Sequence, residues 1–151
     1  MIDGVRTKQL VTHPDERGWL FEILRCDDDM FIRFGQIYLT AVYPGVVKAW
    51  HGHTRQTDAF TIVSGMAKLV LVDLREKSPT KGEIAEFVIG DHNRLLVQIP
   101  PGVFHGFKGI GCQPALALNC PDQPYDRDHP DEIRLPHDTD KIDYSWELHH
   151  G

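Results

Sequence analysis

The chain has 151 residues, of which 41% are hydrophobic and 25% charged, which is typical of one globular domain and unlike a disordered chain or a coiled coil. Its formal net charge of −6 provides no basic surplus for a phosphate backbone, so no nucleic-acid partner is expected. No stretch reaches the roughly 18–20 apolar residues of a membrane span, and Met1–Lys8 lacks a signal-peptide pattern. We therefore expect a cytoplasmic protein without a membrane partner.

The cysteines are Cys26, Cys112 and Cys120. Their number is odd, and no two have the spacing of a CxxC pair. The sequence therefore predicts free thiols, with neither a disulfide framework nor a cysteine zinc site.

Short apolar runs punctuated by glycine and proline predict an all-β fold. Turn chemistry occurs at Asp15–Gly18, Tyr43–Gly45, Ser64–Gly65 and Pro100–Gly102, where proline fixes φ and glycine accepts positive φ. The expected strands, in chain order, are Lys8–Thr12, Trp19–Arg25, Gln36–Tyr43, Val47–Trp50, Ala59–Val63, Ala67–Asp73, Ala85–Ile89, Leu95–Ile99 and Ala115–Asn119. Many short strands of this kind are typical of a sandwich or a barrel.

After Asn119 the chain becomes polar and rich in proline, aspartate and histidine. Such a segment cannot supply a core of its own, so we expect one domain, with a barrel over residues 1–120 and a wrapping tail over 121–151. A short amphipathic turn or helix is expected near Asp140–Leu148. Its packing side chains would be Ile142, Tyr144, Trp146 and Leu148. No function is assigned to His149 or His150.

Histidines in the middle of the chain are predicted to share one site. His51 and His53 are two residues apart, and in a strand such residues point to the same face. Asp58 arrives from the next strand after a short loop, and the Pro100–Gly102 turn delivers His105. Imidazole and carboxylate groups in such a set are suited either to proton transfer or to holding a divalent metal.

Two spaced motifs resemble those of the cupin superfamily. Gly45 is followed by five residues, His51-x-His53, Asp58 and Gly65, and the second motif is Pro100-Pro-Gly-x-x-His105. The resemblance implies a double-stranded β-helix, or jelly-roll, barrel. It also implies that these residues line the mouth of the barrel, where cupins often hold a divalent metal.

A longer resemblance covers nearly the whole chain. The similarity is to dTDP-4-dehydrorhamnose 3,5-epimerase and its relatives, and the matching residues are His13–Glu22, Gln36, Tyr43–Lys48, Val72–Arg75, Ser78–Thr80, Ile99–Phe107, Cys120–Asp122 and Lys141–Tyr144. It implies a dimeric, usually metal-free cupin that acts on a nucleotide-linked 4-keto-6-deoxyhexose.

The resemblance also implies roles for individual residues. His51 matches the base that removes a proton next to the C4 ketone, and Asp143 matches its carboxylate partner. Histidine suits this task because its ordinary pKa lies near neutrality. Arg17 matches a contact to the nucleotide diphosphate, and Lys48 stands where relatives have an arginine near the sugar or phosphate. Further matching pocket positions are Glu22, Gln36 and His105.

Two positions depart from the family pattern. Asp58 stands where the family has a lysine that stabilises the enolate oxygen, and Leu118 stands where it has a tyrosine that returns the proton from the opposite face. A carboxylate beside a developing enolate would raise the barrier, because electrostatic stabilisation is usually the largest catalytic term. Either the activity has changed, or the site only binds a nucleotide sugar.

Asp58 has a second interpretation, because it restores the acid of the metal-binding cupin motif. The possible ligands for Fe(II), Mn(II), Ni(II) or Zn(II) would then be His51, His53, Asp58 and His105, and a metal would polarise the ketone in place of the lysine. The 3,4-ketoisomerases of dTDP-4-keto-6-deoxyglucose, a related family, carry a His-x-His pair without a metal.

The first hypothesis is an isomerase or epimerase of a nucleotide-linked 4-keto-6-deoxy sugar, without a cofactor, in deoxysugar, lipopolysaccharide or other surface-polysaccharide biosynthesis. His51 would be the base and Asp143 its partner, while His53 and His105 handle the ketone or a second proton. Arg17 and Lys48 would hold the diphosphate. A homodimer is expected, because open barrels expose sheet edges that pairing covers. A metal-dependent cupin enzyme and a non-catalytic nucleotide-sugar-binding relative are the alternatives.

Overall fold

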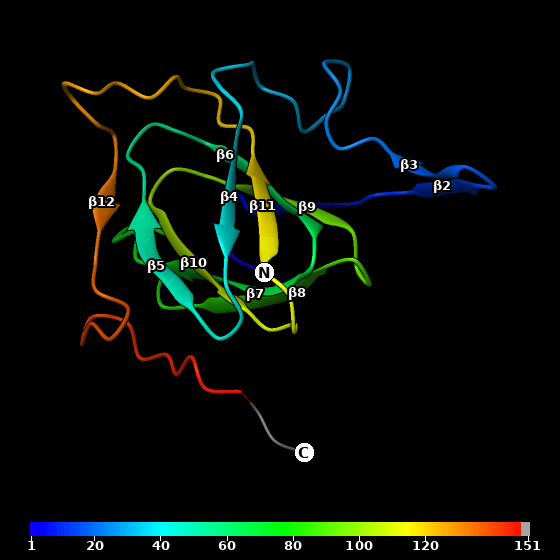
Figure 1. Ribbon diagram of the computed structural model, residues 1–151. Helices are drawn as coiled ribbons and strands as arrows, with labels where there is room; N and C mark the ends of the chain where they lie inside the picture. Colours follow the sequence, from blue (N-terminus) through cyan, green and yellow to red (C-terminus); the bar gives the residue numbers. More distant parts are fainter. Residues whose placement is uncertain (149–151) are drawn as a thin grey trace.

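Antiparallel β-sheets form the body of the chain in the computed structural model, which describes residues 1–148. This described range contains strands and no helix, so the predicted all-β class is confirmed. One five-stranded sheet has the order β1 (Arg6–Gln9), β9 (Leu95–Ile99), β6 (Asp58–Ser64), β11 (Ala115–Asn119) and β4 (Tyr38–Val42). The other has the order β12 (Ile133–Arg134), β5 (Val47–Gly52), β10 (Val103–Gly109), β7 (Met66–Asp73) and β8 (Ile84–Gly90). Figure 1 shows the two sheets facing each other around a common interior.

The interior is filled by side chains that alternate along the strands of both sheets. In β7, for example, Leu69 and Leu71 point into the main core, whereas Val70 and Val72 lie on the outer face. Successive residues of a strand point to opposite faces, so one strand serves two clusters. The same rule separates His51 from its neighbour Trp50, whose side chain belongs to the outer cluster.

The C-terminal tail covers that outer face. Ile142 and Trp146 are buried against Trp50, with the two indole rings 4.9 Å apart between centroids, and Figure 1 shows this segment in red on the outside of the barrel. The expected packing of these two residues is therefore observed, but no helix forms near them, and Leu148 is exposed. His149 and His150 lie outside the described residues.

The sequence prediction missed strand β10, because it has a turn at Pro100–Gly102 and no strand between Ile99 and Ala115. The strand alternates buried Val103, His105 and Phe107, but Gly106 interrupts the apolar pattern. A Cβ at Gly106 would lie 2.3 Å from the Cβ of Ala49 in β5. The glycine therefore permits the close approach of two strands, a role that weakens the strand signal in the sequence.

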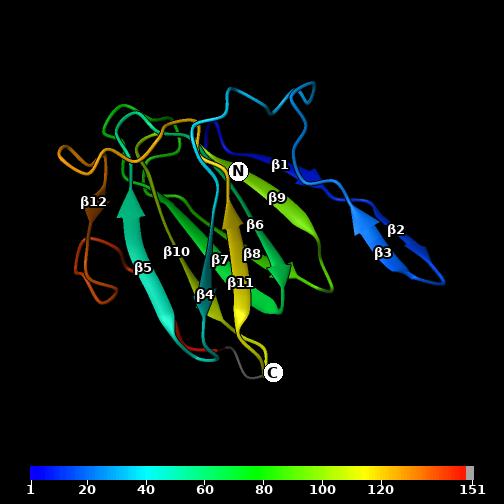
Figure 2. The same cartoon turned by 45° about the horizontal axis from the view of Figure 1, so that its top comes forward.

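Other boundaries differ by a few residues. The predicted Lys8–Thr12 strand is divided between β1 and β2 (Thr12–Asp15), and β12 has two residues, too few to give a periodic pattern. Strands β2 and β3 (Gly18–Phe21) form a hairpin that projects from the barrel, as Figures 1 and 2 show. No helix in the described residues is long and apolar enough to cross a membrane.

Candidate active site

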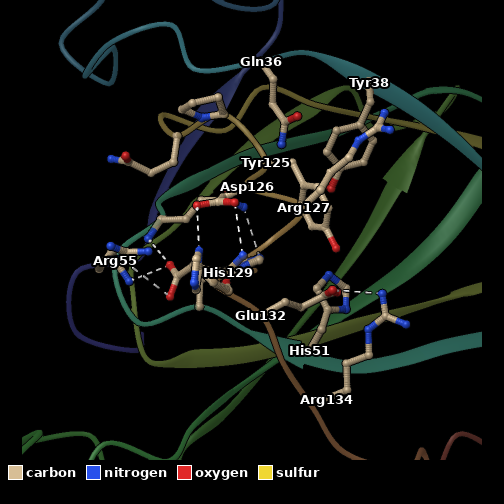
Figure 3. Close-up of a pocket in the computed structure, with 15 residues that line it drawn as sticks. Gln36, Tyr38, His51, Arg55, Tyr125, Asp126, Arg127, His129, Glu132 and Arg134 are labelled. Carbon is tan, nitrogen blue, oxygen red and sulfur yellow. Dashed lines mark hydrogen bonds and ion pairs between the residues drawn. The ribbon is translucent and has the colours of Figure 1, made fainter.

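A hollow opens at one end of the barrel, between the two sheets. Its larger part has a volume of about 700 Å³ and its smaller part about 510 Å³, within the range of small-molecule sites. The two parts share Tyr38, His51, Glu132 and Arg134. The larger part is polar and is lined further by Gln36, His53, Arg55, Gln56, Tyr125, Arg127, His129 and Asp131, most of which appear in Figure 3.

The structure brings three predicted histidines together. His51 of β5 and His105 of β10 are partners across the strand pair, and their ring centroids are 4.0 Å apart. The ring of His53 lies 6.1 Å from each of them. His105 is fully buried beneath the site, whereas His51 and His53 are half-buried and line the hollow.

Asp58 lies below the histidines at the start of β6, and it is 1% exposed. Its Oδ1 accepts hydrogen bonds of 2.8 Å from both Gln56 Nε2 and Asn119 Nδ2. Its Oδ2 lies 3.4 Å from His53 Nε2 and 3.3 Å from His105 Nε2. Neither Asp58 Oδ2 nor His105 Nε2 has a hydrogen-bond partner among the described residues.

The backbone fixes which nitrogen of each ring carries the proton. His53 Nδ1 donates to the carbonyl oxygen of Asp131, and His105 Nδ1 lies 3.4 Å from the carbonyl oxygen of Val103. In neutral imidazole a proton on Nδ1 leaves Nε2 as an acceptor. Two acceptor nitrogens and a carboxylate oxygen therefore face one another, an arrangement that favours a proton or a cation between them.

Asp131 holds the loop that carries His53. Its carboxylate accepts hydrogen bonds from the Thr54 hydroxyl and from the backbone N–H groups of Thr54, Arg55 and Gln56. Although burial opposes the shift, these donors lower the pKa of Asp131. The carboxylate thus remains charged and keeps the β5–β6 loop in place.

Burial and mutual repulsion keep the inner histidines neutral. The pKa of His51 is lowered to about 3, mainly by burial and then by His105, while Asp58 and Glu132 act in the opposite direction. The pKa of His105 is also lowered to about 3, by burial and then by His53. At neutral pH both rings are therefore free bases.

Glu132 and Arg134 lie at the edge of the site beside His51. Arg134 is the partner of His51 in the β12–β5 pair, and its guanidinium donates a 2.9 Å hydrogen bond to Glu132. Figure 3 shows this ion pair next to the imidazole of His51. The site thus has a carboxylate near the candidate base, supplied by the tail at position 132.

Asp143, the predicted partner of His51, does not reach the histidines. It is exposed, and it has no hydrogen bond or ion pair with a histidine within residues 1–148. Its neighbours Ile142 and Tyr144 pack around Trp50 on the outer face of β5. Because His51 and Trp50 point to opposite faces, the segment that covers one cannot approach the other.

The remaining predicted residues fall into two groups. Gln36 and Lys48 line the hollow, and Lys48 Nζ donates a 2.8 Å hydrogen bond to Thr40. Arg17, at the tip of the β2–β3 hairpin, is 85% exposed and paired with Asp15, and exposed Glu22 is paired with Arg25. Neither Arg17 nor Glu22 lines the hollow of its own chain.

Strand β11 presents Asn119 to the site. Ala117 and Asn119 are buried, and the intervening Leu118 is on the other face of the strand. The side chain in contact with Asp58 at this level is therefore an amide. Next to it lies Tyr38, which is paired with Asn119 in the sheet.

The proposed metal set was His51, His53, Asp58 and His105. The structure places one ligand atom from each of His53, Asp58 and His105 within 4.8 Å of one another, without His51. Imidazole nitrogens and a carboxylate oxygen suit a first-row transition metal. The unpartnered Asp58 Oδ2 and His105 Nε2 make these residues a fitting donor set.

Sequence reasoning missed the groups that the tail brings over the mouth. These are Tyr125, Arg127, His129, Asp131, Glu132 and Arg134, together with Arg55 and Tyr38 from the barrel. The tail is polar and aperiodic, so its residues gave no structural signal beyond composition. Its cluster of charged and aromatic residues was the available indication that it covers a ligand site.

Comparisons with known proteins agree with this geometry. A family model described as dTDP-4-dehydrorhamnose 3,5-epimerase matches residues 1–150. The chain is 42% identical over 146 residues to the spore coat polysaccharide biosynthesis protein SpsL of Bacillus subtilis, covering 97% of each chain. It is 43% identical over 152 residues to the probable low-salt glycan biosynthesis epimerase Agl13 of Haloferax volcanii, covering 98% of this chain and 97% of that protein.

Solved structures show the same fold. A dTDP sugar isomerase from Desulfovibrio desulfuricans superposes with a TM-score of 0.91 at 39% identity, covering 96% of this chain and 92% of the other. NovW, a 4-keto-6-deoxy sugar epimerase from Streptomyces spheroides, superposes with a TM-score of 0.87 at 26% identity, covering 97% and 76%. The predicted cupin-type jelly roll is confirmed, and the chain belongs to the dTDP-4-dehydrorhamnose 3,5-epimerase family.

Proposed function

We propose that this protein is an epimerase or isomerase of a nucleotide-linked 4-keto-6-deoxyhexose, with His51 as the base. The observation that carries the proposal is the neutral imidazole of His51, which lines both parts of the hollow. Family membership and the names of SpsL and Agl13 support a place in surface-polysaccharide or glycan synthesis. The cytoplasm is the compartment that we expect.

The chemistry follows from the acidity of protons next to a ketone. His51 takes a proton from the carbon adjacent to C4, the C–H electron pair moves to the carbonyl oxygen, and an enolate forms beside an imidazolium. The low pKa of His51 applies to the site before the negative charge of the enolate has formed. The enolate and Glu132 both stabilise the imidazolium, so they raise the proton affinity of the base when it is needed.

Cationic groups at the site suit a substrate with a diphosphate. Arg55 and Arg127 line the larger, polar part of the hollow, where guanidinium groups would bind phosphate oxygens. Lys48 lines the smaller part, together with Phe60 and Phe107. Lys48 and Arg134 share this part with His51, so they would stabilise the enolate oxygen in place of the family lysine.

We also propose that the chain acts as a single domain in a homodimer. The β2–β3 hairpin projects into solvent with Val11, Trp19 and Leu20 more than half exposed, which is unfavourable for a hairpin that stays uncovered. Arg17 at its tip cannot reach the hollow of its own chain. In a dimer the hairpin would lie on the second copy and could carry Arg17 to the diphosphate there.

Deuterium exchange tests the proposed function. The protein is incubated with dTDP-4-keto-6-deoxyglucose in D2O, and the C3 and C5 protons are followed by NMR. We expect exchange with the native chain and a loss of about 10³-fold in His51→Asn. The matched control is His92→Asn, which changes an exposed histidine outside the hollow and should keep the exchange. Absence of exchange with the native chain for any nucleotide-linked ketosugar tested would contradict the proposal.

A second candidate function is that of a metal-dependent cupin enzyme. It is favoured by the unpartnered Asp58 Oδ2 and His105 Nε2, which face each other beside His53 Nε2. A metal held by these residues would supply Lewis acidity to a carbonyl group. The chain itself contributes Asp131 and Val103, whose carbonyl oxygens orient the rings of His53 and His105.

Metal content separates the two candidates. Protein prepared without chelator is analysed for metals and is titrated with Co²⁺, which has visible absorption bands when bound by nitrogen and oxygen. The second candidate predicts near-stoichiometric metal that is lost in Asp58→Ala. Glu132→Gln is the control, because it alters a carboxylate outside the donor set. A native site that stays empty after supplementation with Fe²⁺, Mn²⁺, Ni²⁺ and Zn²⁺ would remove this candidate.

A further inference from the structure

Tyr38 stands across the hollow from His51. Tyr38 belongs to β4 at the edge of one sheet, and His51 belongs to β5 near the edge of the other. Both residues line both parts of the hollow. Figure 3 shows Tyr38 entering from above and His51 from below. A sugar ring bound between the sheets would therefore present opposite faces to the two side chains.

The hydrogen bonds of Tyr38 leave its proton available. Its oxygen accepts a 3.0 Å hydrogen bond from Asn119 Nδ2, and the same amide nitrogen donates a 2.8 Å bond to Asp58 Oδ1. An amide nitrogen donates and does not accept. The phenol O–H is therefore not used in this contact, and it can donate to a ligand in the hollow.

The surroundings of Tyr38 suit an acid. Burial raises its pKa, Asn119 opposes that shift, and the charges of Asp58 and Glu132 add to it. The phenol is therefore protonated at neutral pH. When it gives up its proton, the N–H of Asn119 is already in position to stabilise the phenolate.

Inversion at a carbon beside a ketone requires a proton to leave from one face and another to arrive at the opposite face. Resting on the function proposed above, we propose that Tyr38 is the catalytic acid of this second step. The enolate electrons form a new C–H bond with the phenol proton, the carbonyl is restored, and Tyr38 becomes a phenolate. The proton on His51 and the phenolate charge are then neutralised through solvent, so the protein returns to its starting state.

Tyr43 provides a matched control, because it is a tyrosine outside the hollow. It directly follows β4, the strand of Tyr38, and its side chain is 68% exposed. It lines neither part of the hollow. Tyr38, in contrast, is fixed in a strand and hydrogen-bonded to a buried amide.

The test separates proton removal from inversion. Tyr38→Phe and Tyr43→Phe are incubated with dTDP-4-keto-6-deoxyglucose in D2O, and NMR follows both exchange at C3 and C5 and formation of the inverted sugar. We expect Tyr38→Phe to keep exchange within about threefold and to lose inversion by about 10²-fold or more, the usual range for a missing general acid. Tyr43→Phe should keep both activities.

A second measurement keeps the assignment testable if Tyr38→Phe folds poorly. Replacing Tyr38 by 3,5-difluorotyrosine keeps the ring and the hydrogen bond but lowers the phenol pKa. The alkaline limb of the inversion rate should then move to lower pH, while the pH profile of exchange stays unchanged.

Several outcomes would overturn the assignment of Tyr38. Inversion at the native rate in Tyr38→Phe, equal loss of exchange and inversion in that variant, or loss of inversion in Tyr43→Phe would each do so. Failure of the native chain to exchange any nucleotide-linked ketosugar is a different result. It contradicts the proposed function, and the role of Tyr38 falls with it.

Discussion

Two buried aspartates show how the same residue type serves stability in one place and chemistry in another. Asp73, at the end of β7, is 0% exposed, and its carboxylate is enclosed by donors. These donors are the guanidinium and backbone N–H of Arg75 and the hydroxyls of Ser78 and Thr80. Asp58 is 1% exposed, but its Oδ2 has no hydrogen-bond partner among the described residues and faces two imidazole nitrogens.

The two carboxylates differ in whether both of their oxygens have hydrogen-bond partners. Buried carboxylates are normally fully hydrogen-bonded, because an unpartnered one costs the full desolvation penalty. The surroundings of Asp73 meet that requirement and lower its pKa, chiefly through the hydrogen bond from Arg75. The surroundings of Asp58 leave its Oδ2 without a hydrogen bond. This indicates that the unpartnered oxygen is retained for binding or catalysis.

Among the single substitutions, the largest expected effect on stability is at the satisfied carboxylate. Asp73→Asn should lower the free energy of unfolding by about 3 kcal/mol, since it breaks a buried ion pair and leaves Arg75 without its partner. Turnover of the folded fraction should stay near the native value, because Asp73 does not line the hollow. Urea denaturation and steady-state kinetics check the two statements. A stable but inactive Asp73→Asn protein would break the comparison.

Acid should destabilise the site through its neutral histidines. The folded-state pKa values of His51 and His105 are about 3, whereas an unfolded histidine titrates near about 6.5. Between these values the unfolded chain binds more protons, so stability is complete above about pH 6.5 and is lost as the pH falls. The expected slope is up to about 1.4 kcal/mol per pH unit for each histidine.

Denaturation curves between pH 7 and pH 4 check this expectation. His105→Asn should flatten the slope, and His92→Asn, a change at an exposed position, should leave it as it is. Equal slopes in the native chain and in His105→Asn would show that the buried histidine is not the source of the acid sensitivity.

Asp58→Asn should have the opposite effects to Asp73→Asn, with higher stability and lower activity. An amide in place of the carboxylate can donate to His53 Nε2 or His105 Nε2, so the free energy of unfolding should rise by about 1 kcal/mol. Activity should fall by about tenfold or more, because the charge of Asp58 raises the proton affinity of His51, and this support of the base outweighs the repulsion of an enolate that the sequence suggested. Paired denaturation and exchange measurements decide the point. A variant that is both less stable and fully active would assign Asp58 to structure.

The smallest expected effect on stability belongs to Arg17. Its side chain is 85% exposed, so Arg17→Ala should change the free energy of unfolding by less than about 0.5 kcal/mol. If the hairpin reaches the diphosphate bound by a second copy, KM should rise several-fold while kcat stays similar. An unchanged KM would leave the hairpin without a role in binding.

The sequence predicted most of the fold because strands such as Leu95–Ile99 and Ala115–Asn119 have clear apolar patterns between turn signals. It failed at β10, where Gly106 is required by the approach of Ala49, and at the two-residue β12. In both cases a contact with a distant strand decides the structure. Local patterns do not contain that information.

For the site, motif spacing placed His51, His53, Asp58 and His105 near one another, and the pairing of His105 on β10 with His51 on β5 accounts for the innermost contact. The partner of His51 could not be predicted in the same way. The tail is aperiodic, and whether position 132 or position 143 reaches the histidines depends on the face of β5 that each segment covers. Packing of Ile142 and Trp146 on Trp50 decides that question.

The most direct test is a crystal structure of His51→Asn with bound dTDP-4-keto-6-deoxyglucose. We expect the hexose ring between β5 and β4, with C3 or C5 beside position 51 on one face and the Tyr38 hydroxyl on the other. The diphosphate should lie toward Arg55 and Arg127. A sugar bound outside the hollow, or with both side chains on the same face of the ring, would contradict the account.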